Sequence, residues 1–376
     1  MSKVLVLASW PRSLINFRGP LLRAMVAAGH EVVAAAPDVM EGIPDRLAAL
    51  GVRFVPVDLE RAGTDPRRDV ATFRQLVRVL AKERPEVMLS YTIKPVIYGS
   101  IAGKVAGVKR IYSAITGLGH LFIDPSRKVA VARAVACQMY KAALKTNHRV
   151  FFQNPDDRGE FVRRGLVPEE KTVIVNGSGV DLASYPRVPP VTDPPTFLYM
   201  GRYLVEKGLR ELIEAVRVVK AQAPDARVVL VGRADDNPSS IRPAELASWI
   251  AEGLVEDKGW VEDVRPYLRD CSVYVLPSYR EGTPRSVLEA MASGRPVITT
   301  DAPGCRETVK HGVTGLLVPV RTSAPLAEAM LSFVRDRQQI VRMGDASWQY
   351  VAEKYDVNAV NRHMLRTMGL LPDGSP

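Results

Sequence analysis

Residues 196–232, TFLYMGRYLVEKGLRELIEAVRVVKAQAPDARVVLVG, decide the fold class. TFLYMGR (196–202) has the short, apolar composition of a β-strand, and ARVVLVG (226–232) repeats it. Between them, LRELIEAVRVVKAQAP (209–224) spaces its apolar side chains as an amphipathic helix does. A strand, a helix and a second strand in this order predict a βαβ unit, in which the two strands lie parallel in one sheet.

The same alternation extends over the whole chain of 376 residues. Apolar strand-like runs recur at intervals that leave room for a helix, which is typical of doubly wound parallel sheets. The further runs are KVLVLAS (3–9), EVVAAAPD (31–38), FVPVDL (54–59), VMLSYT (87–92), RIYSAIT (110–116), RVFFQN (149–154), VYVLPS (273–278), PVITTD (296–301) and GLLVPV (315–320). The pattern predicts an α/β protein with two Rossmann-like domains.

A proline-rich stretch, PRVPPVTDPP (186–195), interrupts the alternation. Five prolines in ten positions exclude a helix or a central strand, so the stretch is predicted to be a linker. We therefore expect an N-terminal domain over residues 1–185 and a C-terminal domain over residues 196–350. Residues 351–376 are expected to form a last helix.

Charge is spread unevenly along the chain, whose net charge is +10. Residues 1–180 hold 27 lysines and arginines against 16 acidic residues, a net charge of +11. Residues 181–376 hold 24 against 25, a net charge of −1. Such asymmetry suggests an anionic partner for the first half: a nucleic acid, a membrane surface or a phosphorylated substrate. The alternative is that the excess arginine merely solvates helices.

Several protein classes are disfavoured by composition. No run of about 18 apolar residues is present, which argues against a transmembrane helix. The apolar run near the N-terminus reads as a first strand and not as a signal peptide. Cys137, Cys271 and Cys305 are scattered, which indicates a reducing compartment, and the absence of a CxxC motif argues against structural zinc.

Two adjacent acid pairs, Asp156–Asp157 and Asp235–Asp236, lack further obvious metal ligands, so turn or capping roles are favoured and no metal is expected. The GxGxxG fingerprint of nicotinamide proteins is absent after the first strand, where SWPRSLINFRGP (9–20) stands instead. A nicotinamide dehydrogenase is therefore disfavoured.

Arg202 and Lys207 are the first candidate site residues. They lie five residues apart, after a predicted strand and before a predicted helix. Two cations beside a helix N-terminus suit a diphosphate, because the unpaired N–H groups there also attract anions. Taken alone, the pair reads equally well as two surface cations in a loop.

The stretch SYREGTPRSVLEAMASG (278–294) contains the second candidates, Glu281 and Glu289. Thr283 is predicted to cap the following helix, and Pro284 suits its first turn. Carboxylates hydrogen-bond vicinal hydroxyl groups well, so a sugar or a ribose is a natural ligand. Without other motifs, the two glutamates could be surface decoration.

Candidate residues in the first half lie after predicted strand ends. Gly117 and Gly119 allow a ligand to approach the backbone. His120 could act as an acid or a base, although a partly buried structural histidine is the simpler interpretation. These candidates are Asn16, Arg18, Lys94, Thr116 and His120.

Taken together, GR…EKG (201–208), REGTPRSVLEAMASGRPVI (280–298) and PGCRE (303–307) resemble the signature of family 4 retaining glycosyltransferases, which have the GT-B fold of two facing Rossmann-like domains. The first half resembles a narrower group, the bacterial PglA-type and polysaccharide-assembly enzymes, which include N-acetylgalactosaminyltransferases. The stretches that carry this second resemblance are NFRGPL (16–21), TIKPVIYG (92–99), TGLG (116–119), FFQN (151–154) and NGSGVDL (176–182).

The resemblance implies a role for each matching residue. Arg202 and Lys207 would bind the donor diphosphate, Glu281 the donor sugar, and Glu289 the ribose. The remaining donor-binding residues would be Gly201, Gly282, Thr283, Pro284, Arg285, Lys258 and Trp260. Two departures from the wider family stand out: SWPRSLINFRG replaces a glycine-glycine loop, and the match around His120 is to TGLG and not to the histidine.

The implied activity is transfer of a sugar, a HexNAc such as GalNAc, from a UDP-sugar to an undecaprenyl-diphosphate-linked saccharide. The resemblance implies no metal or other cofactor and no nucleic acid. It implies a cytoplasmic protein, peripheral on the membrane. The basic segment 125–145 suits an interfacial helix on anionic lipid, and the alternative is an ordinary amphipathic core helix with a basic outer face. The last helix would cross back to the first domain.

Three alternatives remain: transfer to a soluble acceptor, a UDP-sugar 2-epimerase with the same fold, and a non-catalytic binding subunit.

Overall fold

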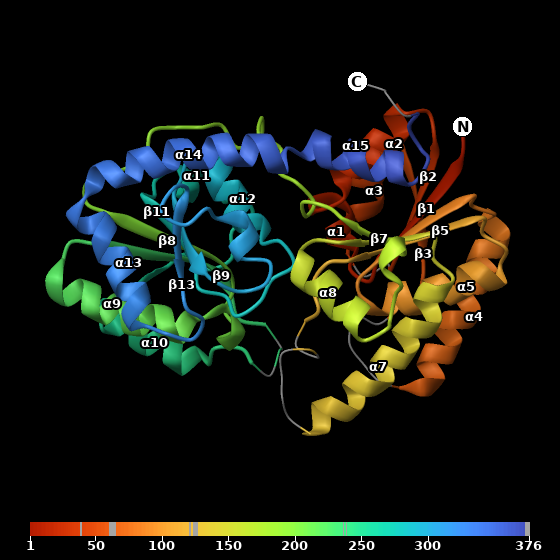
Figure 1. Ribbon diagram of the computed structural model, residues 1–376, viewed down its shortest axis with the longest axis horizontal. Coiled ribbons are helices and arrows are strands. Elements are labelled where there is room, and N and C mark those ends of the chain that lie inside the picture. The colour runs from red at the N-terminus through yellow and green to blue at the C-terminus, as the bar shows by residue number, and fades with distance from the viewer. Residues whose placement is uncertain are drawn as a thin grey trace. The chain divides into compact units, whose positions relative to one another are not determined.

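The computed structural model describes residues 1–37, 40–59, 65–119, 122, 127–235, 237 and 239–372. It divides into two compact units (Figure 1): Met1–Ser178 with Val357–Pro376, called unit 1 here, and Gly179–Asp356, called unit 2. The chain therefore passes from unit 1 to unit 2 between Ser178 and Gly179, before the proline-rich stretch at which the domain boundary was expected.

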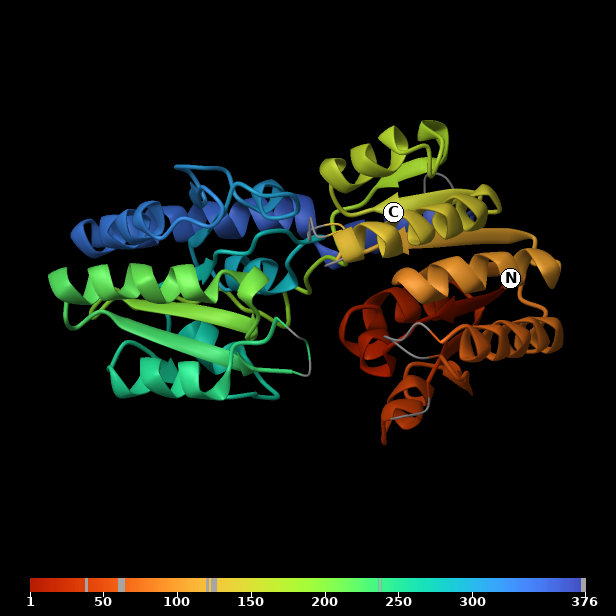
Figure 2. The same ribbon diagram turned by 90° about the horizontal axis from the view of Figure 1, so that it is seen from below.

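Unit 1 is built on a seven-stranded sheet in the order β3-β2-β1-β4-β5-β6-β7, with every pairing parallel. Helices lie on both faces (Figure 2), and the central strands β1, β4 and β5 are mostly buried and apolar, as expected for a parallel sheet covered on both faces. The strands are β1 (Lys3–Leu7), β2 (Glu31–Ala36), β3 (Val52–Pro56), β4 (Val87–Tyr91), β5 (Arg110–Ile115), β6 (Arg149–Phe152) and β7 (Thr172–Ile174).

The helices of unit 1 divide between two core layers. Leu21 and Leu22 of α2 and Met364 of α15 share a buried cluster with Val4 and Val6 of the sheet. On the other face, side chains of α4 and α5 pack against Leu5 and Leu7. The helices are α1 (Pro11–Asn16), α2 (Gly19–Ala27), α3 (Ile43–Ala48), α4 (Pro66–Glu83), η1 (Pro95–Gly99), α5 (Ser100–Val105), α7 (Arg127–Lys145), α8 (Pro155–Arg163), η2 (Glu169–Lys171) and α15 (Val357–Thr367).

Unit 2 contains a six-stranded parallel sheet in the order β10-β9-β8-β11-β12-β13. Its strands are β8 (Thr196–Arg202), β9 (Arg227–Arg233), β10 (Glu256–Asp257), β11 (Val273–Leu276), β12 (Val297–Thr300) and β13 (Gly315–Val318). Its helices are η3 (Val205–Lys207), α9 (Leu209–Gln222), α10 (Pro243–Ala251), α11 (Arg265–Arg269), α12 (Arg285–Ala292), η4 (Arg306–Thr308), α13 (Ala324–Arg335) and α14 (Arg337–Tyr355). The predicted class of two doubly wound parallel α/β domains is confirmed.

The proline-rich stretch was predicted to be a linker, and the structure corrects this. Its Val188 carbonyl accepts a hydrogen bond from the Arg295 guanidinium of unit 2 at 3.1 Å. Arg187 forms an ion pair with Asp345, and Asp193 forms one with Arg337, both on α14. Prolines exclude helix and sheet, but the backbone carbonyl groups and the charged side chains of the stretch can still bond to the rest of unit 2.

The C-terminal end of the chain returns to unit 1. Helix α14 continues to Tyr355, past the expected boundary at residue 350, and α15 then packs against α2 (Figure 1). The Val180 N–H donates to the Tyr355 carbonyl at 2.9 Å, so the two places where the chain changes unit lie side by side. In the described part of the chain, no helix is long and apolar enough to cross a membrane.

Candidate functional site

The loop after β8 is held against the end of β11 by Gly208. This glycine precedes α9 with φ 72°, and a Cβ atom there would overlap the Pro277 carbonyl oxygen. Only glycine fits both conditions. The Tyr279 N–H also donates to the Glu206 carbonyl at 2.9 Å. Because of this close approach, Lys207 lies beside the residues that follow β11.

Lys207 and Glu281 form an ion pair, and the Ser278 hydroxyl donates to the same Glu281 oxygen at 2.6 Å. The side chains of Lys207 and Glu281 are 19% and 14% exposed. The Glu281 N–H donates to the Pro303 carbonyl at 2.9 Å, which fixes the backbone. A cation and a carboxylate predicted from separate motifs are thus in direct contact at the carboxyl edge of the sheet.

Arg202, at the end of β8, also has a carboxylate partner. Its Nη1 donates to Asp235 Oδ2 at 2.9 Å, and its side chain is 46% exposed. Asp235 accepts the Asn237 N–H at 3.0 Å as well, which agrees with the predicted turn role, while Asp236 lies outside the described residues. Gly201, one residue earlier, pairs with Gly232 of β9. Both predicted diphosphate ligands are therefore cations that already face an acid.

Helix α12 positions the second glutamate. It begins at Arg285, with Pro284 in an extended conformation before it and no side-chain capping bond. The predicted cap at Thr283, with Pro284 inside the first turn, is thus wrong by one residue. Glu289 Oε1 accepts a hydrogen bond from Arg285 Nε at 2.9 Å, one turn earlier on the same helix face.

Burial raises the pKa of the Glu289 carboxyl, and the nearby Arg285 guanidinium and Tyr185 hydroxyl only partly offset that effect. The same burial, together with the Glu289 charge, raises the pKa of Tyr185. Glu289 is thus a carboxylate that has lost much of its water, with a phenol hydroxyl and a guanidinium beside it. A ligand hydroxyl would find a strong acceptor there.

The backbone between the two glutamates is supported from behind by the loop that contains Gly304. Gly304 has φ 80°, and a Cβ atom on it would overlap the carbonyl oxygens of Glu281 and Gly282. Gly282 and Pro284 are buried, and Thr283 is partly buried. The glycine of the PGCRE motif therefore has a steric role, because its lack of a side chain allows the backbone of the EGTP segment to lie against it.

Lys258 and Trp260 follow β10 at the edge of the sheet. Lys258 forms an ion pair with Glu256 at 3.0 Å, and Trp260 is 51% exposed with the Arg233 guanidinium 5.8 Å from its ring centroid. Gly259 between them accepts the Gly232 N–H at 2.9 Å. An exposed indole beside the end of β9 offers a face on which a base could stack.

The candidates in unit 1 are less alike. Asn16 is exposed at the end of α1, whereas Arg18 is buried with its guanidinium 5.0 Å from the Tyr91 ring centroid. Lys94 donates to Asp69 Oδ1 at 2.8 Å, so it is paired with a protein carboxylate at the strand end where an anion was expected. Thr116 lines a cavity, and His120 lies outside the described residues.

Three polar residues at the site in unit 2 were missed. Ser278 is the last residue of a predicted strand, and Asp235 follows another and was assigned only a turn or capping role; their positions at strand ends could have marked both. Tyr185 precedes the proline-rich stretch, and nothing in its sequence context points to the site. Among the described residues, no group of three or more His, Cys, Asp or Glu side chains is arranged to hold a metal, and metal independence stays a prediction.

Comparisons with known proteins cover both units. Residues 18–177 match the family described as "Glycosyl transferase 4-like domain", and residues 194–336 match "Glycosyl transferases group 1". The Campylobacter jejuni N,N'-diacetylbacillosaminyl-diphospho-undecaprenol alpha-1,3-N-acetylgalactosaminyltransferase is 28% identical over 367 residues, covering 94% of this chain and 95% of that relative. The Staphylococcus aureus capsular polysaccharide biosynthesis glycosyltransferase CapM is 24% identical over 308 residues, covering 77% and 79%.

Solved structures agree in fold. Anabaena HepE, crystallised in complex with UDP and glucose, superposes with a TM-score of 0.80 at 19% identity, covering 99% of this chain and 100% of that one. Two family domains in tandem, two parallel sheets and this similarity point to one conclusion. The chain belongs to the group 1, family 4-like glycosyltransferases and has their GT-B fold.

Proposed function

We propose that this glycosyltransferase moves a sugar, a HexNAc such as GalNAc, from a UDP-sugar to an undecaprenyl-diphosphate-linked saccharide in glycan or polysaccharide assembly. The observation that carries the donor part is the cluster of Lys207, Glu281 and Ser278 at the end of β11, with Arg202 at the end of neighbouring β8. The Campylobacter relative, named for N-acetylgalactosaminyl transfer to a diphospho-undecaprenol sugar, supports the acceptor class.

In this proposal Arg202 and Lys207 stabilise negative charge on the departing diphosphate. Each preorganised donor of this kind can be worth roughly 3 kcal/mol of transition-state stabilisation. The diphosphate would replace Asp235 at Arg202, and Lys207 would turn from Glu281, which leaves that carboxylate for the sugar hydroxyls. In retaining transfer the departing phosphate oxygen takes the acceptor's proton, while the glycosidic bond breaks and the new one forms on the same face of the sugar.

The membrane part of the proposal rests on α7. Val131 and Val135, one turn apart on this helix, are 68% and 56% exposed, and Lys141 and Lys145 are exposed nearer its end. This surface suits the interface of an anionic bilayer. Aspartate at both valines should abolish co-sedimentation with phosphatidylglycerol vesicles, while Val105→Asp, a change at a similarly exposed valine of α5, should not. Equal retention of both variants would contradict the assignment.

Alanine substitutions of the two cations test the donor site. With UDP-GalNAc and an undecaprenyl-diphosphate-linked N-acetylated sugar, Arg202→Ala and Lys207→Ala should each lower kcat by roughly a hundredfold or more, since each removes one charge donor. Arg217→Ala, which breaks an exposed ion pair on α9, serves as the control. Normal turnover by both site variants would refute the diphosphate assignment. Conversion of UDP-GlcNAc without acceptor would instead indicate an epimerase.

A further inference from the structure

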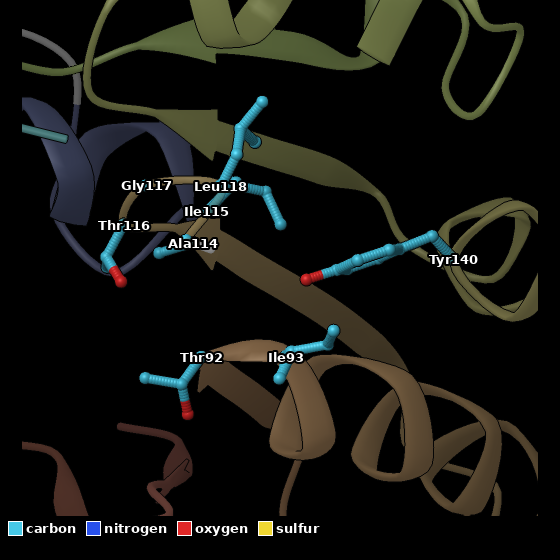
Figure 3. A pocket seen from close by; sticks show the side chains of 9 residues that line it. Thr92, Ile93, Ala114, Ile115, Thr116, Gly117, Leu118 and Tyr140 are labelled. Carbon is cyan, nitrogen blue, oxygen red and sulfur yellow. The ribbon is translucent and has the colours of Figure 1, made fainter. Parts of the chain in front are cut away.

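Unit 1 contains a cavity of about 240 Å³ at the carboxyl ends of the neighbouring strands β4 and β5 (Figure 3). Ligands of doubly wound sheets bind outside these strand ends. The cavity is lined by Thr92, Ile93, Ala114, Ile115, Thr116, Gly117, Leu118, Gly119 and Tyr140. Of these, Thr116 was a candidate site residue, and Gly117 and Gly119 were expected to allow a close approach to the backbone. All of these lining residues belong to unit 1.

Tyr140 of α7 is a buried residue whose hydroxyl group opens onto this cavity. The residue is 5% exposed, and Figure 3 shows its hydroxyl directed into the cavity. Within the described ranges, no protein group forms a hydrogen bond with that hydroxyl. A hydroxyl that opens onto a cavity without a protein partner is available to a water molecule or to a polar atom of a ligand. Burial also raises the pKa of the phenol, which keeps it protonated and able to donate.

The walls around this hydroxyl are aliphatic. Ile115 and Leu118 are buried, and Figure 3 shows the Ile93 and Ile115 side chains directed at the same space as the Tyr140 hydroxyl. The cavity therefore combines an apolar wall with the Tyr140 hydroxyl, and Thr92 and Thr116 also belong to its lining. An acetamido group has this combination: a methyl, with a carbonyl oxygen and an N–H beside it.

Thr92, at the edge of the cavity, has a strained backbone. Its φ is 70°, which is uncommon for a β-branched residue, and its hydroxyl bonds that of Ser9 at 2.8 Å. Strain of this kind persists where surrounding structure enforces it, and it gathers at ligand sites. Thr92 therefore adds a strained backbone position to the turn after β4 at the edge of the cavity.

We propose that this cavity receives the acetamido group of the acceptor sugar, with the methyl against Ile93 and Ile115 and the amide hydrogen-bonded to the Tyr140 hydroxyl. A volume of about 240 Å³ holds only part of a ligand, since whole-ligand pockets run from roughly 300 to 1,000 Å³. An isoprenoid chain would fill the same space but leave the hydroxyl unpaired. The inference rests on the proposed function, because it assigns the acceptor.

The test is direct binding to the full chain with saturating UDP present. Saturation-transfer NMR follows the acetamido methyl of methyl 2-acetamido-2-deoxy-β-D-glucopyranoside, and methyl β-D-glucopyranoside is the matched probe without acetamido. Tyr140→Phe should weaken binding of the first probe by about tenfold, the effect of one lost hydrogen bond, and leave binding of the second unchanged. The melting temperature of Tyr140→Phe should not fall, because the lost hydroxyl bonds nothing in the protein.

Two controls place the probe. Tyr112→Phe removes another buried hydroxyl of unit 1, one that donates to the Met368 carbonyl at 3.3 Å outside the cavity, and should leave probe binding unchanged. Glu281→Gln should also leave it unchanged, because that residue lies at the donor site. Loss of probe binding in Glu281→Gln, or equal binding in wild type and Tyr140→Phe, would overturn the inference.

The same samples separate this inference from the proposed function. If UDP stabilises the chain thermally and Tyr140→Phe binds the acetamido probe normally, only the cavity assignment fails. If UDP gives no stabilisation at any concentration, the donor assignment in unit 2 fails instead. Preference for n-octyl β-D-glucopyranoside over the acetamido probe, unaffected by Tyr140→Phe, would assign the cavity to an alkyl chain and overturn the proposal.

Discussion

Glu289 is a buried carboxylate whose proposed role in ligand binding has a consequence for stability. Its carboxyl is only 14% exposed, and burial raises its pKa above the ordinary value of 4.5. A group whose pKa is raised by folding contributes stability that is complete below its ordinary pKa and is lost as the pH rises through the raised value. Ionised Glu289 at neutral pH is therefore a strained acceptor that a ribose hydroxyl would relieve.

Glu289→Gln should uncouple these two effects. The variant cannot ionise, so its unfolding free energy relative to wild type should increase from pH 4.5 to pH 7. Its affinity for UDP should fall by roughly ten- to a hundredfold, because a hydrogen bond to a charged acceptor is lost. Urea unfolding at both pH values and UDP titration measure the two effects. A variant that loses relative stability as the pH rises would show that the carboxylate is stabilising when ionised.

At the scale of residues, the sequence predicted the individual site residues but not the contacts between residues of different motifs. Glu281, Glu289, Arg202 and Lys207 stand out in the sequence because cations and acids flank predicted strand ends. The Lys207–Glu281 pair could not be predicted, because it requires β11 to neighbour β8, and strand order is set by packing of the whole sheet. Their roles with a donor stay predictions.

At the scale of elements, the turn from β8 into α9 depends on one glycine. An alanine at position 208 would meet two penalties. Its backbone would be left-handed, and its Cβ atom would overlap the Pro277 carbonyl oxygen. Gly253 is a matched control, because it has the same φ of 72° but no atom within 4 Å of its Cβ position. We expect Gly253→Ala to lower the unfolding free energy by roughly 1–2 kcal/mol, and Gly208→Ala to lower it clearly further.

Gly208→Ala should also lower the response to UDP, because Lys207 lies next to the displaced turn. Thermal unfolding with and without UDP measures both effects in one experiment. Equal losses of stability in the two alanine variants would mean that the turn moves away from Pro277 without penalty.

Element types were easier to predict than their connections. Alternating apolar runs identified the parallel strands, because such strands are buried on both faces and read as continuous hydrophobic segments. The proline-rich stretch was mistaken for a linker, because local composition excludes helix and strand but says nothing of partners far along the chain. The stretch is held by Arg295, Arg337 and Asp345, and each of them lies more than 100 residues along the chain from its partner in the stretch.

At the scale of the whole molecule, the chain crosses between its units twice, and the crossings are adjacent at Val180 and Asp356. The last segment completes the core of unit 1: Met364, Leu365, Met368 and Leu370 are all buried in the cluster beneath α2. Unit 1 is therefore assembled from both ends of the sequence. A fault in α15 should weaken unit 1 although 178 intervening residues belong to unit 2.

Two matched methionines test whether the units are stabilised separately. Met364 of α15 and Met330 of α13 are both fully buried, the first in unit 1 and the second in unit 2. Each alanine substitution should cost about 2–5 kcal/mol, the usual penalty for a cavity of this size. Hydrogen exchange should show faster opening of β1 and β4 in Met364→Ala, and of β8 and β11 in Met330→Ala. Loss of protection across both sheets in either variant would mean that the units open together, and that the core completed by α15 supports unit 2 as well.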